Sequence, residues 1–145
     1  MSNRKKRKKI KENLPIVKDL NQQIAETVAG LTYLSETDAE IAVFVGLKAD
    51  TITAENLLTQ IGNADHKVEE KDFDEFFEPL IKTQNWFGED ERKMTEKFVV
   101  LKDLLQQNLI NKKVFRIGKI DIDIYVVGLD KDNILRGIQT KAVET

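Results

Sequence analysis

The sequence has no cysteine, and its 145 residues include only two prolines and seven glycines. Without cysteine, the chain forms no disulfide bond and has no thiolate to act as a nucleophile or metal ligand. No apolar run approaches the roughly 18 residues that a membrane-spanning helix needs. The basic beginning is not followed by the apolar stretch of a signal peptide. We therefore expect a cytoplasmic protein that does not associate with membranes.

The sequence also lacks the patterns that usually accompany catalysis. It has no glycine-rich phosphate loop, zinc-ligand spacing or internal repeat. The one histidine, His66, stands in the loop segment NADHK with no nucleophile placed near it, so we interpret it as a solvated residue rather than a general base. The sequence therefore predicts a protein that is not an enzyme and that needs no cofactor.

Two groups of carboxylates are the candidates for a cation site. Asp121 and Asp123 alternate along an expected strand, where such a pair is more often the polar face than a calcium or magnesium site, which needs more oxygen ligands. The same two interpretations apply to an acidic cluster formed by Glu69, Glu70, Asp72, Asp74 and Glu75. We expect no metal site within the chain.

Charge is distributed unevenly between the beginning of the chain and the rest. The net charge is -2, but residues 1–12 hold seven of the 23 basic residues and one of the 25 acidic ones, which leaves -8 for residues 13–145. The basic block Arg4–Lys9 is typical of a solubilising tail, and alternatively of a weak contact to nucleic acid. The acidic remainder favours a basic partner protein over phosphate.

Length and composition indicate one domain. At 145 residues and 41% hydrophobic content, the chain is large enough to bury about two-thirds of its unfolded surface around a single core. We expect a basic, disordered tail at residues 1–13 and one domain at residues 14–145.

Changes in hydrophobic periodicity predict the elements of this domain. Apolar residues at helical spacing, acidic starts and glycine stops predict four helices, at residues 15–34, 51–61, 72–81 and 89–108. A β-branched run predicts a strand at residues 41–46. Beyond residue 108 the period falls to two, which predicts an antiparallel hairpin with its turn at Gly118 and Lys119 and a third strand at residues 134–143. The order indicates an α+β sandwich with a largely antiparallel sheet.

The tryptophan in TQNWFGEDE does not belong to the periodic face of either neighbouring helix. Trp86 stands among polar residues, beside Gly88. A tryptophan in a loop either covers the core or anchors an interface, and its acidic and amide neighbours are typical of the second role.

Three segments together resemble the nuclease A inhibitor family. They are GLTYLSET at residues 30–37, TQNWFGEDE around Trp86, and VFRIGKIDIDIYVVG with the final GIQTKAVET. The likeness covers roughly residues 20–145 and is densest over the last thirty. It implies a three-layer α/β/α sandwich with a mixed, largely antiparallel sheet. It also implies a monomer that inhibits a sugar-nonspecific, magnesium-dependent endonuclease of the ββα-metal type in a 1:1 complex.

The resemblance also implies the residues that bind this partner. Thr145 corresponds to the threonine that reaches the nuclease metal, Glu36 to the glutamate that pairs with a nuclease arginine, and Trp86 to the contacting tryptophan. Asn85 replaces an acidic residue of the family, and Glu144 precedes the threonine. A threonine at the end of a strand supplies hydroxyl and carboxylate oxygens, which suit magnesium or its bound waters. The alternative is an interaction or nucleic-acid-binding protein of the same fold that uses Arg4–Lys9.

Overall fold

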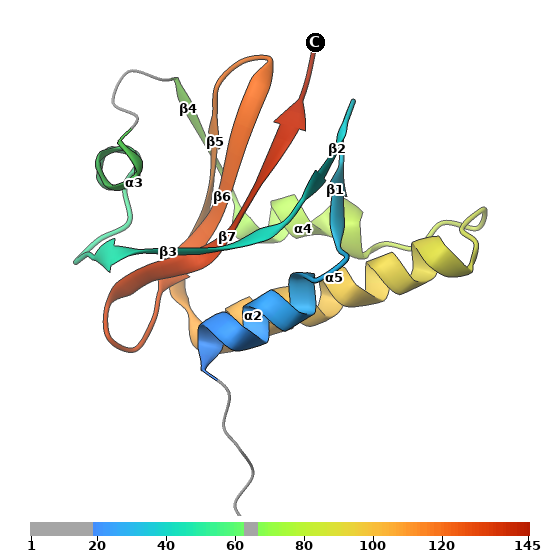
Figure 1. Cartoon of the computed structure of the whole chain (residues 1–145), viewed down its shortest axis with the longest axis horizontal. Coiled ribbons are helices and arrows are strands. Elements are labelled where there is room, and N and C mark those ends of the chain that lie inside the picture. The colour runs from blue at the N-terminus through green and yellow to red at the C-terminus, as the bar shows by residue number, and fades with distance from the viewer. Residues whose placement is uncertain (1–18, 63–66) are drawn as a thin grey trace, which may run out of the picture.

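The computed structural model describes residues 19–62 and 67–145, and its centre is a five-stranded sheet (Figure 1). The strand order is β3-β7-β6-β5-β4, and every neighbouring pair is antiparallel. The strands are β3 Ala42–Lys48, β4 Val68–Lys71, β5 Ile110–Ile117, β6 Asp121–Leu129 and β7 Ile134–Val143. The predicted hairpin is confirmed as β5 and β6, and β7 lies between β6 and the edge strand β3.

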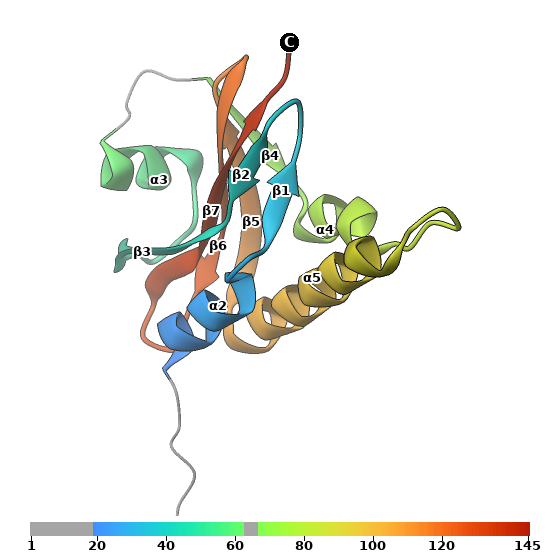
Figure 2. The same ribbon diagram turned by 45° about the vertical axis from the view of Figure 1, so that its right-hand side comes forward.

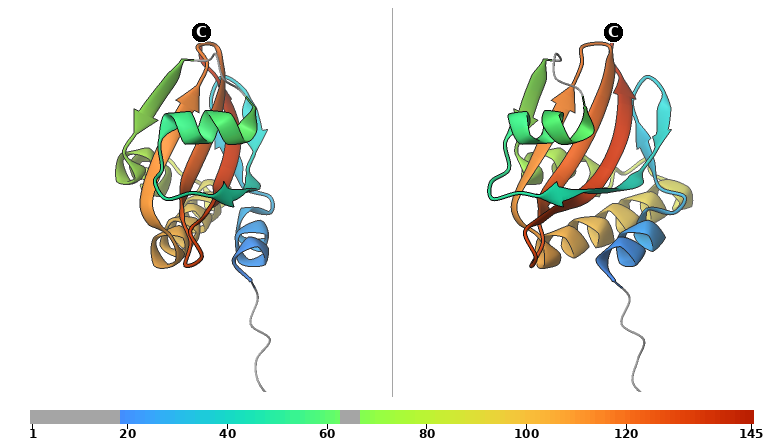
Figure 3. Two further views of the ribbon diagram at one scale, coloured as in Figure 1. Left: turned by 90° about the vertical axis from the view of Figure 1, so that its left-hand side faces the viewer. Right: turned by 60° about the vertical axis from the view of Figure 1, so that its left-hand side comes forward.

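Helices cover both faces of this sheet. They are α2 Leu20–Val28, α3 Ala54–Ile61, α4 Phe73–Ile81 and α5 Glu89–Asn108. Helix α3 lies alone over one face, whereas α2, α4 and α5 lie on the other side (Figures 1 and 3). The predicted α+β class is confirmed, and the arrangement is consistent with three layers.

The sheet is buried on both faces, and alternation along its central strands explains how. On β5, Val114 belongs to the core under α4 and α5, and the next residue, Phe115, belongs to the core under α3. Both are completely buried. Because successive side chains of a strand point to opposite faces, a strand covered on both sides reads as a nearly continuous apolar run. The second part of β6, IYVVGL at residues 124–129, is of this kind.

Helix α5 has the predicted bounds because its start is specified locally. Gly88 is the N-cap residue, and its backbone N–H donates a 3.0 Å hydrogen bond to the Glu91 carboxylate in the first turn. Glu89, Asp90 and Glu91 place negative charge where the helix dipole stabilises it. Phe98, Leu101 and Leu105 then form the buried face.

The predicted helix at residues 15–34 was too long. Helix α2 ends at Val28, Gly30 turns the chain with a φ of 75°, and a hairpin follows, with β1 at Thr32–Leu34 and β2 at Asp38–Glu40. This hairpin and β4 were missed because strands of three or four residues are too short to show a period of two. Residues 15–18 lie outside the described part.

The β1–β2 hairpin stands beside the last strand rather than joining the main sheet (Figure 2). The hydroxyl of Thr140 on β7 donates a 2.9 Å hydrogen bond to the carbonyl of Glu40 on β2. On β1, Tyr33 stacks on Phe76 of α4 with ring centroids 5.7 Å apart. The hairpin is therefore held between β7 and the helix layer, and its turn lies near the end of β7.

Several sequence predictions fall on residues that the structure does not describe. The tail expected at residues 1–13, including Arg4–Lys9, and the loop residue His66 are among them. Among the described helices, none has the length and apolar character required to cross a membrane.

Candidate functional site

The turn of the β1–β2 hairpin binds the end of β7 through backbone and side-chain hydrogen bonds. The Val143 N–H donates to the Ser35 hydroxyl oxygen at 3.0 Å, and the Glu36 N–H donates to the Val143 carbonyl at 3.3 Å. The Ser35 hydroxyl in turn donates to the carbonyl of Thr37 at 2.9 Å, which fixes the turn. Residues 35–37 thus hold a strand end more than 100 positions away in the sequence.

Glu36 and Thr145, which the resemblance names separately, are in direct contact. The Thr145 N–H donates to Glu36 Oε2 at 2.5 Å, and the Thr145 hydroxyl donates to Glu36 Oε1 at 2.6 Å. Both residues are exposed. The hydroxyl and then the amide hydrogen bond of Thr145 hold the pKa of Glu36 below its ordinary value. We call this four-residue arrangement of Ser35, Glu36, Val143 and Thr145 the clasp.

Glu144 faces a different partner from its two neighbours. Its Oε1 lies 2.5 Å from Nη2 of Arg116 on β5, a side chain of which only 10% is exposed. Burial acts to lower the pKa of Arg116, but the hydrogen bond and the charge of Glu144 raise it overall. Burial raises the pKa of Tyr33, and the neighbouring Arg116 opposes this effect. The structure therefore turns Glu144 toward a cation of its own chain.

Trp86 is exposed, which removes the interpretation that it covers the core. Its relative exposure is 75%, and its ring packs edge-on against Phe87 with centroids 4.6 Å apart. The Phe87 N–H donates to the carbonyl of Gln84 at 3.0 Å, so the loop is a hydrogen-bonded turn that leads into the start of α5. Asn85 is also exposed.

An open cavity of about 310 Å³ links the Trp86 loop to the hairpin. Trp86 and Phe87 line one part, Leu34 of β1 lines another, and Met94 and Phe98 of α5 are also in the lining. Leu34 is 65% exposed and precedes the clasp by one residue. The cavity therefore lies between the Trp86 loop and strand β1, whose last residue directly precedes the clasp.

Two of the carboxylates considered as cation ligands have local partners. Asp72 caps α4 by accepting from the Glu75 N–H at 3.1 Å, and Glu70 lies 3.3 Å from Lys113. In residues 19–62 and 67–145, no cluster of three or more histidine, cysteine, aspartate or glutamate residues could hold a metal ion, and Asp121 and Asp123 gain no third ligand.

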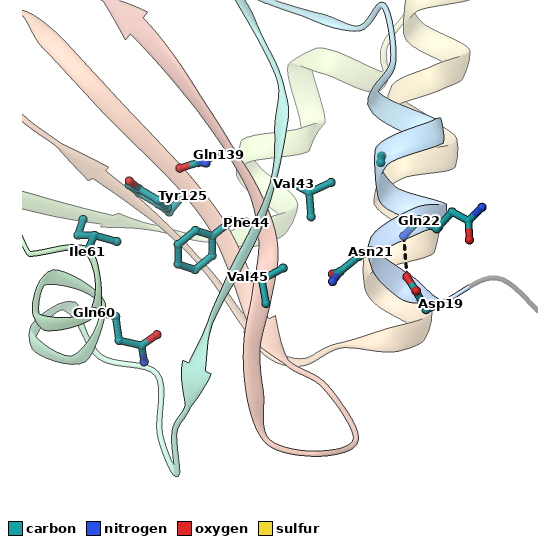
Figure 4. A pocket seen from close by; sticks show the side chains of 11 residues that line it. Asp19, Asn21, Gln22, Val43, Phe44, Val45, Gln60, Ile61, Tyr125 and Gln139 are labelled. Atoms are coloured by element: carbon teal, nitrogen blue, oxygen red, sulfur yellow. Dashed lines mark hydrogen bonds between the residues drawn. The ribbon is translucent and has the colours of Figure 1, made fainter.

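A shallow depression along β3 between α2 and α3 has no catalytic arrangement among its described lining residues (Figure 4). Among the described residues that line it, only Asp19 and Tyr125 have ionisable side chains. Asp19 accepts from the Gln22 N–H at 2.8 Å as the cap of α2, and burial raises the pKa of Tyr125. Tyr125 packs edge-on against Phe44 at 5.1 Å. These described residues supply no pair of nucleophile and base.

Sequence reasoning missed Arg116 and Ser35 as parts of this surface. A signal for Arg116 was present, because the segment VFRI places it among three apolar residues of one strand. A charged residue at such a position requires a partner. Ser35 gave no comparable signal, since its bond to Val143 depends on the fold.

Comparison with known proteins gives one family. A family model described as nuclease A inhibitor-like protein matches residues 18–145, which is most of the chain. No curated protein matches it. The family match supports a nuclease-inhibitor role in general terms and agrees with the expectation that the chain is not an enzyme.

The clasp predicts how Glu36 titrates. Its lowered pKa means that the clasp contributes stability above the ordinary pKa of a glutamate and loses this contribution as the pH falls through the lowered value. Thr145→Val removes the hydroxyl donor, so the Glu36 pKa should rise toward its ordinary value, whereas Thr145→Ser should keep it low. The measurement is an NMR titration of the side-chain carboxyl carbons.

Glu78 serves as the internal control for this titration. The hydrogen bond and charge of Lys82 lower its pKa, with Nζ 2.8 Å from Oε1, so the Thr145 variants should leave it unchanged. A Glu36 midpoint that is the same in the wild type and in Thr145→Val would show that the clasp does not form in solution.

Proposed function

The chain belongs to the nuclease A inhibitor-like family, and we propose that it inhibits a sugar-nonspecific, magnesium-dependent ββα-metal endonuclease by occupying its active site. The observation that carries this proposal is the contact between Glu36 and Thr145. The resemblance assigns these two residues to the nuclease arginine and the nuclease metal, respectively. Their direct contact supports the proposal that Glu36 and Thr145 bind the nuclease together, as one unit.

The hydrogen-bond direction within the clasp suits this role. A hydroxyl has one proton and two acceptor lone pairs. Because Thr145 donates its proton to Glu36, the lone pairs are left for a cation or for water bound to one. Oxygen is the ligand that magnesium prefers. The Glu36 carboxylate accepts two bonds from Thr145 and has further lone pairs with which to accept an arginine.

Trp86 and Leu34 supply the apolar part of the proposed interface. Both are large side chains with more than half of their surface exposed, and both line the same cavity beside the clasp. Interface energy concentrates in buried aromatic anchors, whereas the polar surroundings mainly exclude water. We propose that the nuclease covers this cavity while Thr145 enters its active site. The exposed Asn85 then lies at the edge of the contact.

The net charge supports a partner of this kind. Outside residues 1–12 the chain carries -8, and a cleft that holds DNA phosphates is basic. Complementary charge accelerates association and places the inhibitor in competition with DNA. Arg4–Lys9 would be the contact in the alternative nucleic-acid-binding role, and these residues are not needed for the proposed surface.

A cleavage titration tests the proposal directly. A fixed amount of a ββα-metal nuclease, in magnesium and with plasmid DNA, is mixed with increasing amounts of the purified protein. We expect cleavage to fall linearly and to stop at one inhibitor per nuclease. Deleting residues 1–12 should not change this stoichiometry. Unaltered cleavage at a large molar excess would reject the proposal.

Trp86→Ala tests the proposed anchor. Loss of a buried interface tryptophan typically costs at least about 2 kcal/mol, roughly thirtyfold in affinity. Because Trp86 is 75% exposed, the melting temperature should barely change. Inhibition constants and thermal unfolding of the same preparations measure both effects.

Leu47→Ala is the matched control for this variant. Leu47 is a large apolar residue of β3 with 69% exposure, and it does not line the cavity beside Trp86. The Leu47→Ala variant should inhibit the nuclease as strongly as the wild-type protein does. Equal inhibition constants for Trp86→Ala and Leu47→Ala would place the interface elsewhere.

A further inference from the structure

Glu144, the first residue after β7, is attached at points separate from the clasp. Beyond Val143, the N–H of Glu144 donates to the carbonyl of Ile120 at 2.9 Å, and its carboxylate lies 2.5 Å from the Arg116 guanidinium. Residues past the end of a strand usually fray unless they are tied down. Glu144 is held by one backbone hydrogen bond and one ion pair. It directly precedes Thr145, the residue that contacts Glu36.

The geometry of the sheet explains why Arg116 can make this contact. On β7 and its extension, Ala142 lies in the core on the side of α4 and α5, and alternation places Glu144 on the same face. On β5, Val114 belongs to that core and Arg116 follows it by two. Ile122 of β6 lies in that core too, and it lines the same small cavity as Arg116 and Glu144.

Stability of the fold is a poor explanation for a buried guanidinium at this position. Burying a charge costs free energy of desolvation. An ion pair with one solvent-exposed partner offsets little of that desolvation cost, because water screens the attraction. Arg116 is 10% exposed and Glu144 is 51% exposed, so the pair is of this type. An apolar side chain at position 116 would suit the core face better. The arginine is better explained by its ion pair with Glu144.

We propose that Arg116 is a positioning residue, which fixes Glu144 and thereby places Thr145 against Glu36 before any partner binds. This inference rests on the proposed function of the clasp and assigns to Glu144 an internal role instead of a contact with the nuclease. A surface that is ordered in advance loses less conformational freedom on binding, so it binds more tightly with the same contacts.

Arginine rather than lysine suits this task because its planar group has several donors. One edge meets Glu144 while the Tyr33 phenol lies beside the same group, and Tyr33 is itself fixed by stacking on Phe76. A lysine ammonium at this site keeps the positive charge but lacks the rigid, planar set of N–H donors that a guanidinium has. Arg116→Lys should therefore retain part of the effect that Arg116→Met removes.

The experiment compares Arg116→Met, Arg116→Lys and Glu144→Gln with Lys113→Met. Lys113 is the matched control because it is a cation of the same strand, 3.3 Å from Glu70, and its pair does not involve the end of β7. Hydrogen exchange of the Thr145 amide is measured on each free protein, and inhibition of the nuclease is measured on the same samples.

We expect Arg116→Met and Glu144→Gln to speed exchange of the Thr145 amide and to weaken inhibition, each about tenfold, which is the usual effect of losing a charged hydrogen bond. Arg116→Lys should be intermediate, and Lys113→Met should match the wild type in both measurements. Glu144→Gln changes a half-exposed side chain, so it keeps the test valid if Arg116→Met does not fold.

The two measurements separate the inference from the function on which it rests. If the wild-type protein does not inhibit the nuclease, the proposed function fails, and the exchange rate of Thr145 still tests the positioning role. If the wild-type protein inhibits but Glu144→Gln and Arg116→Lys leave both exchange and inhibition unchanged, the positioning role is rejected while the function stands.

Discussion

The hydrogen bonds between Glu36 and Thr145 are the contact on which the proposed surface depends. They join the turn of a short hairpin to Thr145, which follows the end of β7 and lies 109 positions away in the sequence. Neither residue is buried, so the contact is not a by-product of core packing. It requires β7 and the hairpin turn to end at the same point in space.

The fold meets this requirement by fixing each partner separately. Strand β7 is paired with β3 on one side and β6 on the other, so its path is set by two ladders. The hairpin is held to β7 by the bond from Thr140 to Glu40 and to α4 by the stacking of Tyr33. Arg116 adds a third constraint through Glu144. The exposed clasp thus rests on buried or half-buried supports.

Sequence patterns predicted the described helices and the longer strands, and they failed on the strands of three or four residues. Helix α5 and the strands β5, β6 and β7 extend over enough residues to display a period, whereas β1, β2 and β4 do not. The resemblance supplied Glu36, Trp86 and Thr145 but not the contact between the first and last of them. That contact, like the pairing of Arg116 with Glu144, joins residues far apart in the chain, and only the strand order brings them together.

A double-mutant cycle of inhibition constants tests most directly whether Glu36 and Thr145 act as one unit. The proteins are the wild type, Glu36→Gln, Thr145→Val and the double variant, assayed against one ββα-metal nuclease, with Asp132→Asn as a control for the loss of one negative charge. We expect the double variant to be no weaker than the weaker single variant, which corresponds to a coupling of at least about 1 kcal/mol. Strictly additive losses would contradict the clasp as the inhibitory unit.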